Sequence, residues 1–184
     1  MSQRAETDAS HRSFRPYFIA GFVMLVVLYA ADQLTKNAVV THMFEGQAIP
    51  VVDGVLWWHF IRNPGAAFSM GESVTWIFTI VMVIVAGVVI YYLPRARSRA
   101  WILALCGLLA GVLGNLTDRL LREPGFARGH VVDFISVPHF AIFNIADSCI
   151  TVSIVVLAIL MVTGVPLDGR AHPDPTPASD KDAS

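Results

Sequence analysis

The sequence predicts an α-helical integral membrane protein with four transmembrane helices and a small extracytoplasmic β-sheet cradle between the first two. Hydrophobic residues make up 55% of the 184 residues and charged residues only 15%, whereas soluble globular domains carry about a quarter charged residues. The apolar residues also cluster into runs of roughly the 20 residues that a helix needs to cross a bilayer. The formal net charge of −1 gives no electrostatic basis for nucleic acid as a partner.

The first predicted helix follows a polar tail. Residues 1–15 contain three arginines and no apolar periodicity, so we expect a disordered tail. The apolar run 17–31 is followed by no pair of small residues at cleavage-site spacing, which favours a retained helix over a signal peptide. Asp32 and Lys36 are four residues apart and share a helical face. They are either an interfacial ion pair that ends the helix or the border of a site in the same leaflet.

Residues 37–73 differ in character from the runs on either side. The stretch 49–61 combines β-branched and aromatic residues with a Pro and an Asp-Gly turn, which predicts short strands rather than a helix. A turn-rich stretch of small residues follows at 62–71. Trp57 and Trp58 belong to the residue type that collects at the headgroup level of a bilayer. We therefore expect a small sheet that rests on the membrane surface.

Three further spans complete the predicted membrane domain, 16–165. The second, 74–93, contains no charged residue and is expected to act as scaffold. The third starts near residue 100 and reaches at least residue 116, and the fourth runs over 142–165. The third span contains small residues three and four positions apart, a pattern typical of close helix packing: Gly107, Ala110, Gly111 and Gly114.

The basic residues predict the orientation. The tail 1–15, the loop 95–99 and the tail 166–184 hold eight of the thirteen Lys and Arg residues. The positive-inside rule then places both termini in the cytoplasm and the sheet segment on the outer side. The C-terminal tail, rich in Pro, Asp and Ala, is expected to be disordered.

Unusual polar residues collect at the outer ends of the first, third and fourth spans. Asn115, Asp118 and Arg119 have the spacing i, i+3, i+4 and share one helical face. Asn144 and Asp147 do the same at the start of the last span. Because lipid-facing polar groups would be left unpaired, we expect these residues to line one shared pocket.

Two carboxylates stand out in this region. Asp133 is expected in a loop just before the last span, and Asp147 in that span. Two acids held close together share one proton, so that one can deprotonate water while the other polarises a carbonyl. This combination indicates peptide hydrolysis by an aspartic dyad. His130 and His139 flank Asp133 without the spacing of a metal site, so no metal or cofactor is expected.

A small proton-coupled transporter is the alternative, because intramembrane carboxylates also serve such pathways. Against it, the polar residues gather at one end of the spans and do not continue toward the cytoplasm. A structural membrane subunit is a third reading, but it does not account for the pairing of Asp133 with Asp147.

Five segments occur in a characteristic order: Asp-Gln-Leu-Thr-Lys at 32–36, Asn-Pro-Gly-Ala-Ala-Phe-Ser at 63–69, Gly-Val-Leu-Gly-Asn-Leu-Thr-Asp-Arg at 111–119, Val-Val-Asp-Phe at 131–134 and Phe-Asn-Ile-Ala-Asp at 143–147. Together they resemble the motifs of signal peptidase II, the bacterial lipoprotein signal peptidases, which are membrane aspartic proteases. The linker 120–129 is longer than is common in that family.

This resemblance implies an endopeptidase that removes the signal peptide from diacylglyceryl-modified prolipoproteins. It would cut N-terminal to the lipidated cysteine at the outer face of the bacterial cytoplasmic membrane. Asp133 and Asp147 are the implied catalytic dyad, and the implied partners are prolipoproteins and membrane lipid, with the enzyme a monomer and no metal bound. The residues implied to bind substrate or support the site are Asn63, Asn115, Arg119, Asn144, Asp118, Asp32, Lys36 and Gly111.

Overall fold

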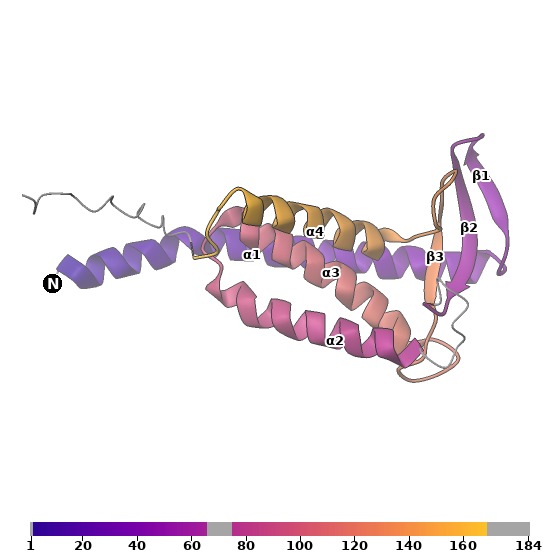
Figure 1. Ribbon diagram of the computed structural model, residues 1–184, viewed down its shortest axis with the longest axis horizontal. Helices are drawn as coiled ribbons and strands as arrows, with labels where there is room; N and C mark the ends of the chain where they lie inside the picture. The colour runs from indigo at the N-terminus through magenta and orange to yellow at the C-terminus, as the bar shows by residue number, and fades with distance from the viewer. Residues whose placement is uncertain (1, 66–74, 169–184) are drawn as a thin grey trace, which may run out of the picture.

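Four long helices run along one axis, and a small sheet covers one end of them (Figure 1). The computed structural model describes residues 2–65 and 75–168, with side chains described from Pro16 onward. Within these ranges the elements are α1 (Ser2–His42), β1 (Ala48–Val52), β2 (Leu56–Asn63), α2 (Thr75–Tyr92), a short 3₁₀ turn η2 (Leu93–Arg95), α3 (Arg99–Leu121), β3 (Val131–Ser136) and α4 (Ile145–Val162).

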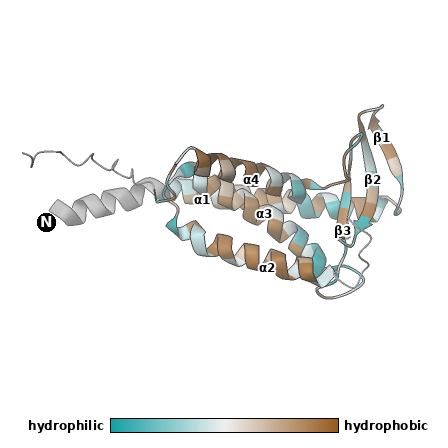
Figure 2. Cartoon of the chain, in the orientation of Figure 1, coloured by the Kyte–Doolittle hydropathy of each residue, from teal (hydrophilic) through white to brown (hydrophobic). Residues whose placement is uncertain are grey.

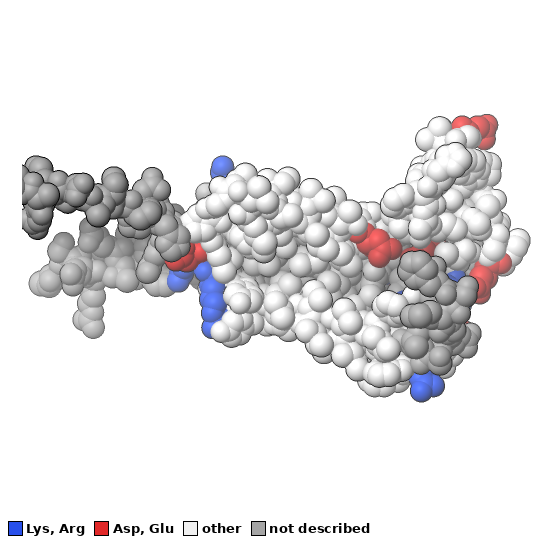
Figure 3. Space-filling view, viewed as in Figure 1, with Lys and Arg blue, Asp and Glu red and all other residues white. Residues whose placement is uncertain are grey.

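The four described helices are each long and apolar enough to cross a membrane, which confirms the predicted fold class. α3 lies at the centre and packs against α1, α2 and α4, so most of its residues are buried. The other three helices expose many apolar side chains, and most of α2 and α4 carries the hydrophobic colour in Figure 2. On the face drawn in Figure 3, the charged side chains that are described lie toward the two ends, as a bilayer requires.

The first helix is longer than expected at both ends. It begins at Ser2 and contains Pro16, so it includes most of the stretch 1–15 for which the sequence predicts a disordered tail. Residues 2–15 contain neither Gly nor Pro, and extending an existing helix needs no new nucleus. At the other end α1 runs on to His42, beyond the change in composition at Asn37.

The remaining helices lie close to the predicted spans. α2 matches 74–93 within one residue, and α3 extends to Leu121. α4 starts three residues later than predicted, because Asn144 caps it. The Asn144 side chain accepts the Asp147 N–H, and the Asp147 side chain accepts the Asn144 N–H. Such a capping box satisfies two of the free N–H groups at a helix start.

The sheet is antiparallel, with strand order β1-β2-β3 among the described residues. β2 pairs with β3 in a register that sets Ile61 opposite Asp133. The prediction that Asp133 lies in a loop is therefore wrong. The run Val-Val-Asp-Phe-Ile has the β-branched and aromatic composition of a strand, and it finds its partner about 70 residues earlier in the chain.

The sheet is fixed to α1 by a second, smaller apolar core. Phe60 from β2 and Val132 and Phe134 from β3 are buried there, against Val39 and Val40 of α1. Consequently the strand that carries Asp133 is anchored to a membrane helix. Parts of two predicted segments, 66–73 of the cradle and 169–184 of the C-terminal tail, lie outside the described residues.

Glycines allow α3 to approach its neighbours at the sheet end. A Cβ on Gly111 would collide with the backbone oxygen of Ala146 in α4. A Cβ on Gly114 would lie 2.6 Å from Asp32 Oδ2 of α1. Since real Cβ atoms do not come this close, both positions require glycine for the observed packing, as the small-residue spacing predicted.

Candidate active site

Asp133 is buried in the middle of β3, with 1% of its surface exposed. Its Oδ2 accepts a hydrogen bond from Asn63 Nδ2 at 2.8 Å, and its Oδ1 accepts one from Asn144 Nδ2 at 2.6 Å. Asn63 ends β2, and its own Oδ1 accepts the Gly65 N–H at 2.8 Å. Both oxygens of Asp133 are thus held by amides from two different elements.

Asp147 is the third residue of α4 and is half-buried. Its Oδ1 accepts a hydrogen bond from Asn115 Nδ2 at 2.7 Å, and its Oδ2 accepts the Asn144 N–H at 3.3 Å. This carboxylate also lies in the first turn of a helix, where negative charge is favoured by the helix dipole. These hydrogen bonds and the helix dipole favour the ionised form of Asp147, against the burial that disfavours it.

Asn144 contacts both acids. Its side-chain NH₂ donates to Asp133, to Asn115 Oδ1 at 3.1 Å and to Val132 O at 3.3 Å, while its Oδ1 accepts the Asp147 N–H at 2.9 Å. Because every polar atom of this buried side chain has a partner, its orientation is determined. Asn144 thereby connects the strand that carries one acid to the helix that carries the other.

The pKa of the Asp133 carboxyl is raised to about 7. Burial is the main cause, since it disfavours the charged form, and the neighbouring charge of Asp147 acts in the same direction. Hydrogen bonds from Asn63 and Asn144 and the charge of Lys36 oppose the rise. At neutral pH and below, Asp133 can therefore carry a proton while lying beside a second acid.

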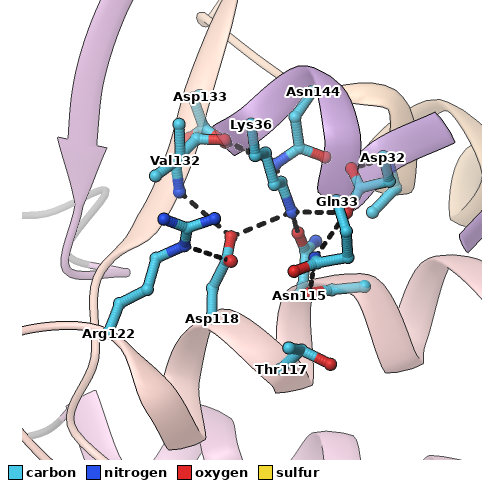
Figure 4. Close-up of polar contacts among 12 residues, drawn as sticks. Asp32, Gln33, Lys36, Asn115, Thr117, Asp118, Arg122, Val132, Asp133 and Asn144 are labelled. Carbon is cyan, nitrogen blue, oxygen red and sulfur yellow. Dashed lines mark hydrogen bonds and ion pairs between the residues drawn. The ribbon is translucent and has the colours of Figure 1, made fainter. Parts of the chain in front are cut away.

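A buried ion network lies next to Asp133 and Asn144 (Figure 4). Lys36 Nζ is 2.8 Å from Asp32 Oδ2 and 2.9 Å from Asp118 Oδ2, and Asp118 Oδ1 also pairs with Arg122. Asp32, Lys36 and Asp118 are each at most 1% exposed. The two negative charges of the aspartates are balanced by the two positive charges of Lys36 and Arg122. Buried charges need such partners, because a low-dielectric interior makes an unpaired charge costly.

Arg119 is buried, but its described hydrogen bonds go to the backbone rather than to either acid. Its Nη1 donates to Asn63 O at 3.1 Å and to Gly129 O at 2.9 Å. It therefore joins the end of β2 to the linker that precedes β3. Its Nε is buried with no hydrogen-bond partner among the described residues.

The structure thus gathers the ten residues named from the sequence at one end of the bundle. Nine of them, the two acids included, are linked by the hydrogen bonds and ion pairs above. The tenth, Gly111, allows α3 to pack closely against α4. Sequence reasoning missed Gln33, which donates to Asp32 Oδ2 at 3.1 Å and to Gly114 O at 3.0 Å. It also missed Arg122, although its position four residues after Asp118 on one helix could have revealed the pair.

Among residues 2–65 and 75–168, no group of three His, Cys, Asp or Glu side chains is arranged to hold a metal ion. The donors that do meet here are two carboxylates and three asparagine amides. One proton-carrying acid beside an acid stabilised as a carboxylate is an arrangement suited to general acid and general base catalysis on water and a carbonyl.

Comparison with known proteins agrees with this chemistry. A family model described as signal peptidase (SPase) II matches residues 24–163. The lipoprotein signal peptidase of Leifsonia xyli subsp. xyli is 48% identical over 170 residues, covering 88% of this chain and 79% of that protein. The lipoprotein signal peptidase of Rhodococcus jostii is 41% identical over 148 residues, covering 80% and 75%.

Solved structures show the same architecture. A bacterial membrane enzyme determined by the in meso method at 1.9 Å resolution superposes with a TM-score of 0.70 and 30% sequence identity, covering 78% of this chain and 92% of that chain. A second, at 2.3 Å resolution, gives a TM-score of 0.69 and 28% identity, covering 84% and 94%.

Proposed function

The chain belongs to the signal peptidase II family, and we propose that Asp133 and Asp147 are the catalytic dyad with which it cuts its substrates. The protein is a multi-pass bacterial membrane aspartic endopeptidase that removes signal peptides from lipoprotein precursors. One observation carries the dyad assignment: Asn144 contacts both acids, its side chain at Asp133 and its backbone N–H at Asp147.

The two acids have different roles in this proposal. Asp147, held by Asn115 and Asn144 as a carboxylate, takes a proton from water, and the water oxygen attacks the scissile carbonyl carbon. Asp133, whose pKa is about 7, gives its proton to the carbonyl oxygen, which forms a gem-diol. Asp147 then passes its proton to the amide nitrogen as the C–N bond breaks. A gem-diol hydroxyl returns a proton to Asp133 as the new carboxyl group forms.

The substrate is a precursor whose cysteine carries a diacylglyceryl group, and the cut lies N-terminal to that cysteine. The position of the acids supports this, because a lipid anchor would hold the scissile bond near the end of the spans. An apolar groove of about 550 Å³ between α1, α3 and α4 reaches Ile145 and Ser148, next to Asp147. It suits an acyl chain of the substrate, and such anchoring lowers the entropic cost of reaction.

Orientation and oligomeric state complete the proposal. The basic loop 95–99 lies between α2 and α3 at the end opposite the sheet (Figure 1), which supports cytoplasmic termini and an active site on the outer side. In this proposal the enzyme acts as a monomer in the membrane, and the two acids with the asparagines that hold them supply the chemistry without a cofactor.

The test compares cleavage of a diacylglyceryl-modified precursor with that of its unmodified form, using purified enzyme in lipid. Asp133→Asn and Asp147→Asn should each abolish turnover of the modified precursor, while their unfolding temperatures stay near that of the wild type. Wild-type enzyme should cut the modified form much faster. Turnover by either Asn variant would refute the dyad, and equal cleavage of both precursors would refute the lipid requirement.

A further inference from the structure

Lys36 has no exposed surface, yet it is not in contact with either acid of the proposed dyad. Its ammonium group is 2.8 Å from Asp32 Oδ2, 2.9 Å from Asp118 Oδ2 and 2.9 Å from Asn115 Oδ1. These three partners use all three hydrogens that an ammonium group can donate. The charge is therefore held at one point between α1 and α3, at the centre of Figure 4.

This position determines which way the Asn115 amide points. Asn115 Oδ1 accepts from Lys36 Nζ at 2.9 Å and from Asn144 Nδ2 at 3.1 Å. A flipped amide would set its NH₂ group against these two donors, which cannot accept. With the oxygen held in this way, Asn115 Nδ2 faces Asp147 Oδ1 at 2.7 Å.

A second connection from Lys36 ends at the same acid. The Asp32 carboxylate that pairs with Lys36 through Oδ2 accepts the Ala146 N–H through Oδ1 at 2.9 Å. Ala146 lies in the first turn of α4, where N–H groups lack partners within the helix. Asp32 therefore caps α4 from another helix, one residue before Asp147.

We propose that Lys36 is the positioning residue for Asp147. It acts through the Asn115 amide and through the Asp32 contact with the start of α4, and so it aims the Asp147 carboxylate at the attacking water. The inference rests on the proposed function, because the aim of Asp147 matters for turnover only if this acid is the general base. The Asp133 carboxyl accepts its hydrogen bonds from Asn63 and Asn144, and the Asp118 partner of Lys36 contacts this strand through the backbone N–H of Val132.

The test is a double-mutant cycle measured as kcat and KM on a diacylglyceryl-modified precursor peptide. Lys36→Met should lower kcat about 100-fold, the loss expected when a reacting group is displaced by about 1 Å. KM should stay within about twofold, because the buried lysine binds no substrate. Since Lys36 acts largely through Asn115, the double variant Lys36→Met/Asn115→Ala should be little slower than Asn115→Ala alone.

The test also needs a control for misfolding, because Lys36→Met leaves the buried carboxylates of Asp32 and Asp118 without their shared cation. The same cycle is therefore also run in an Asp118→Asn background. There the remaining Asp32 carboxylate and the Arg122 guanidinium still balance in charge. Unfolding temperature in detergent identifies any variant that has lost its fold, and the Asp118→Asn cycle then decides the outcome.

Arg122→Met is the matched control. Arg122 pairs with Asp118 in the same network, and its other described contact is Asn37 Oδ1 at 2.9 Å. Among these contacts there is none to Asn115 or Asp32, the two residues through which Lys36 acts. Its effect on kcat should be small and should add to that of Asn115→Ala. If the Lys36 and Asn115 effects add in the same way, or if Lys36→Met raises KM with kcat unchanged, the positioning role is refuted.

The two proposals fail in distinguishable ways. Asp147→Asn is measured in the same assay. Turnover by Asp147→Asn would refute the dyad itself. An inactive Asp147→Asn together with additive Lys36 and Asn115 effects would refute the role of Lys36 alone.

Discussion

Asn144 Nδ2 donates to Asp133 Oδ1 at 2.6 Å and so connects the start of the last membrane helix to the third strand of the sheet. The same residue caps that helix through a reciprocal contact with Asp147. One asparagine therefore controls both the fold of α4 at its first turn and the distance between two elements that each carry an acid. A substitution at this position therefore affects both the geometry of the site and the stability of the helix start.

Activity should fall as pH rises through about 7. The protonated Asp133 is neutral, so burial favours it and raises its pKa to about 7. Below that pH Asp133 can donate its proton to the carbonyl oxygen, and above it the proton is lost. The measurement is kcat against pH on a fixed lipidated substrate. An alkaline limb near the ordinary pKa of an aspartate would contradict the assignment of Asp133 as the acid.

Asn63→Ala should shift this alkaline limb to higher pH. The Asn63 amide donates to Asp133 and lowers its pKa by favouring the charged form. Losing a hydrogen bond of about 1 kcal/mol should move the limb by about half to one pH unit. Asn37→Ala is the matched control, because this exposed asparagine contacts Arg122 and not the acids. The alkaline limb of the Asn37→Ala variant should stay at the wild-type pH. If the limb of Asn63→Ala also stays there, the prediction is contradicted.

Replacing Asn144 should separate catalysis from helix capping. Serine retains an oxygen that can cap α4, while alanine does not, and neither can donate to Asp133 as the amide does. We expect similar losses of kcat in Asn144→Ser and Asn144→Ala, of about 100-fold. The serine variant should be more stable by about 1 kcal/mol. Chemical unfolding in mixed micelles gives the stability difference, and a serine variant with wild-type kcat would show that the amide is not required.

Gly111→Ala should destabilise the protein and lower its rate of turnover. The added methyl group would collide with the backbone oxygen of Ala146, so α4 must move away from α3, at a cost of about 1–3 kcal/mol. Gly87→Ala is the control, since a Cβ there meets no atom within 4 Å. Removing a mid-helix glycine should even stabilise α2 by about 0.5–1 kcal/mol. Equal unfolding temperatures for the two variants would contradict the packing argument.

Much of the site could be predicted because its residues are spaced for a helix. Asp32 and Lys36 are one turn apart, as are Asn115 and Asp118, and these spacings place each pair on one face. The strand β3 could not be predicted in the same way. The strand has only six residues, which is too short for a clear alternating pattern. Its partner β2 lies far away in the sequence, so no local pattern of residues indicates that the two strands pair. The sequence therefore predicts a loop around Asp133, whereas this residue lies in a strand.

The sequence by itself determined the membrane spans, the close-packing glycines and the identity of the polar residues, because hydropathy and helical spacing are local properties. Only the tertiary structure decided which of these residues meet. Asp32 contacts the backbone of Ala146 across 114 positions of the chain, and Lys36 orients Asn115 across 79. Such contacts form because a buried charge or a free helix N–H needs a partner. Which partner it finds depends on how the helices pack.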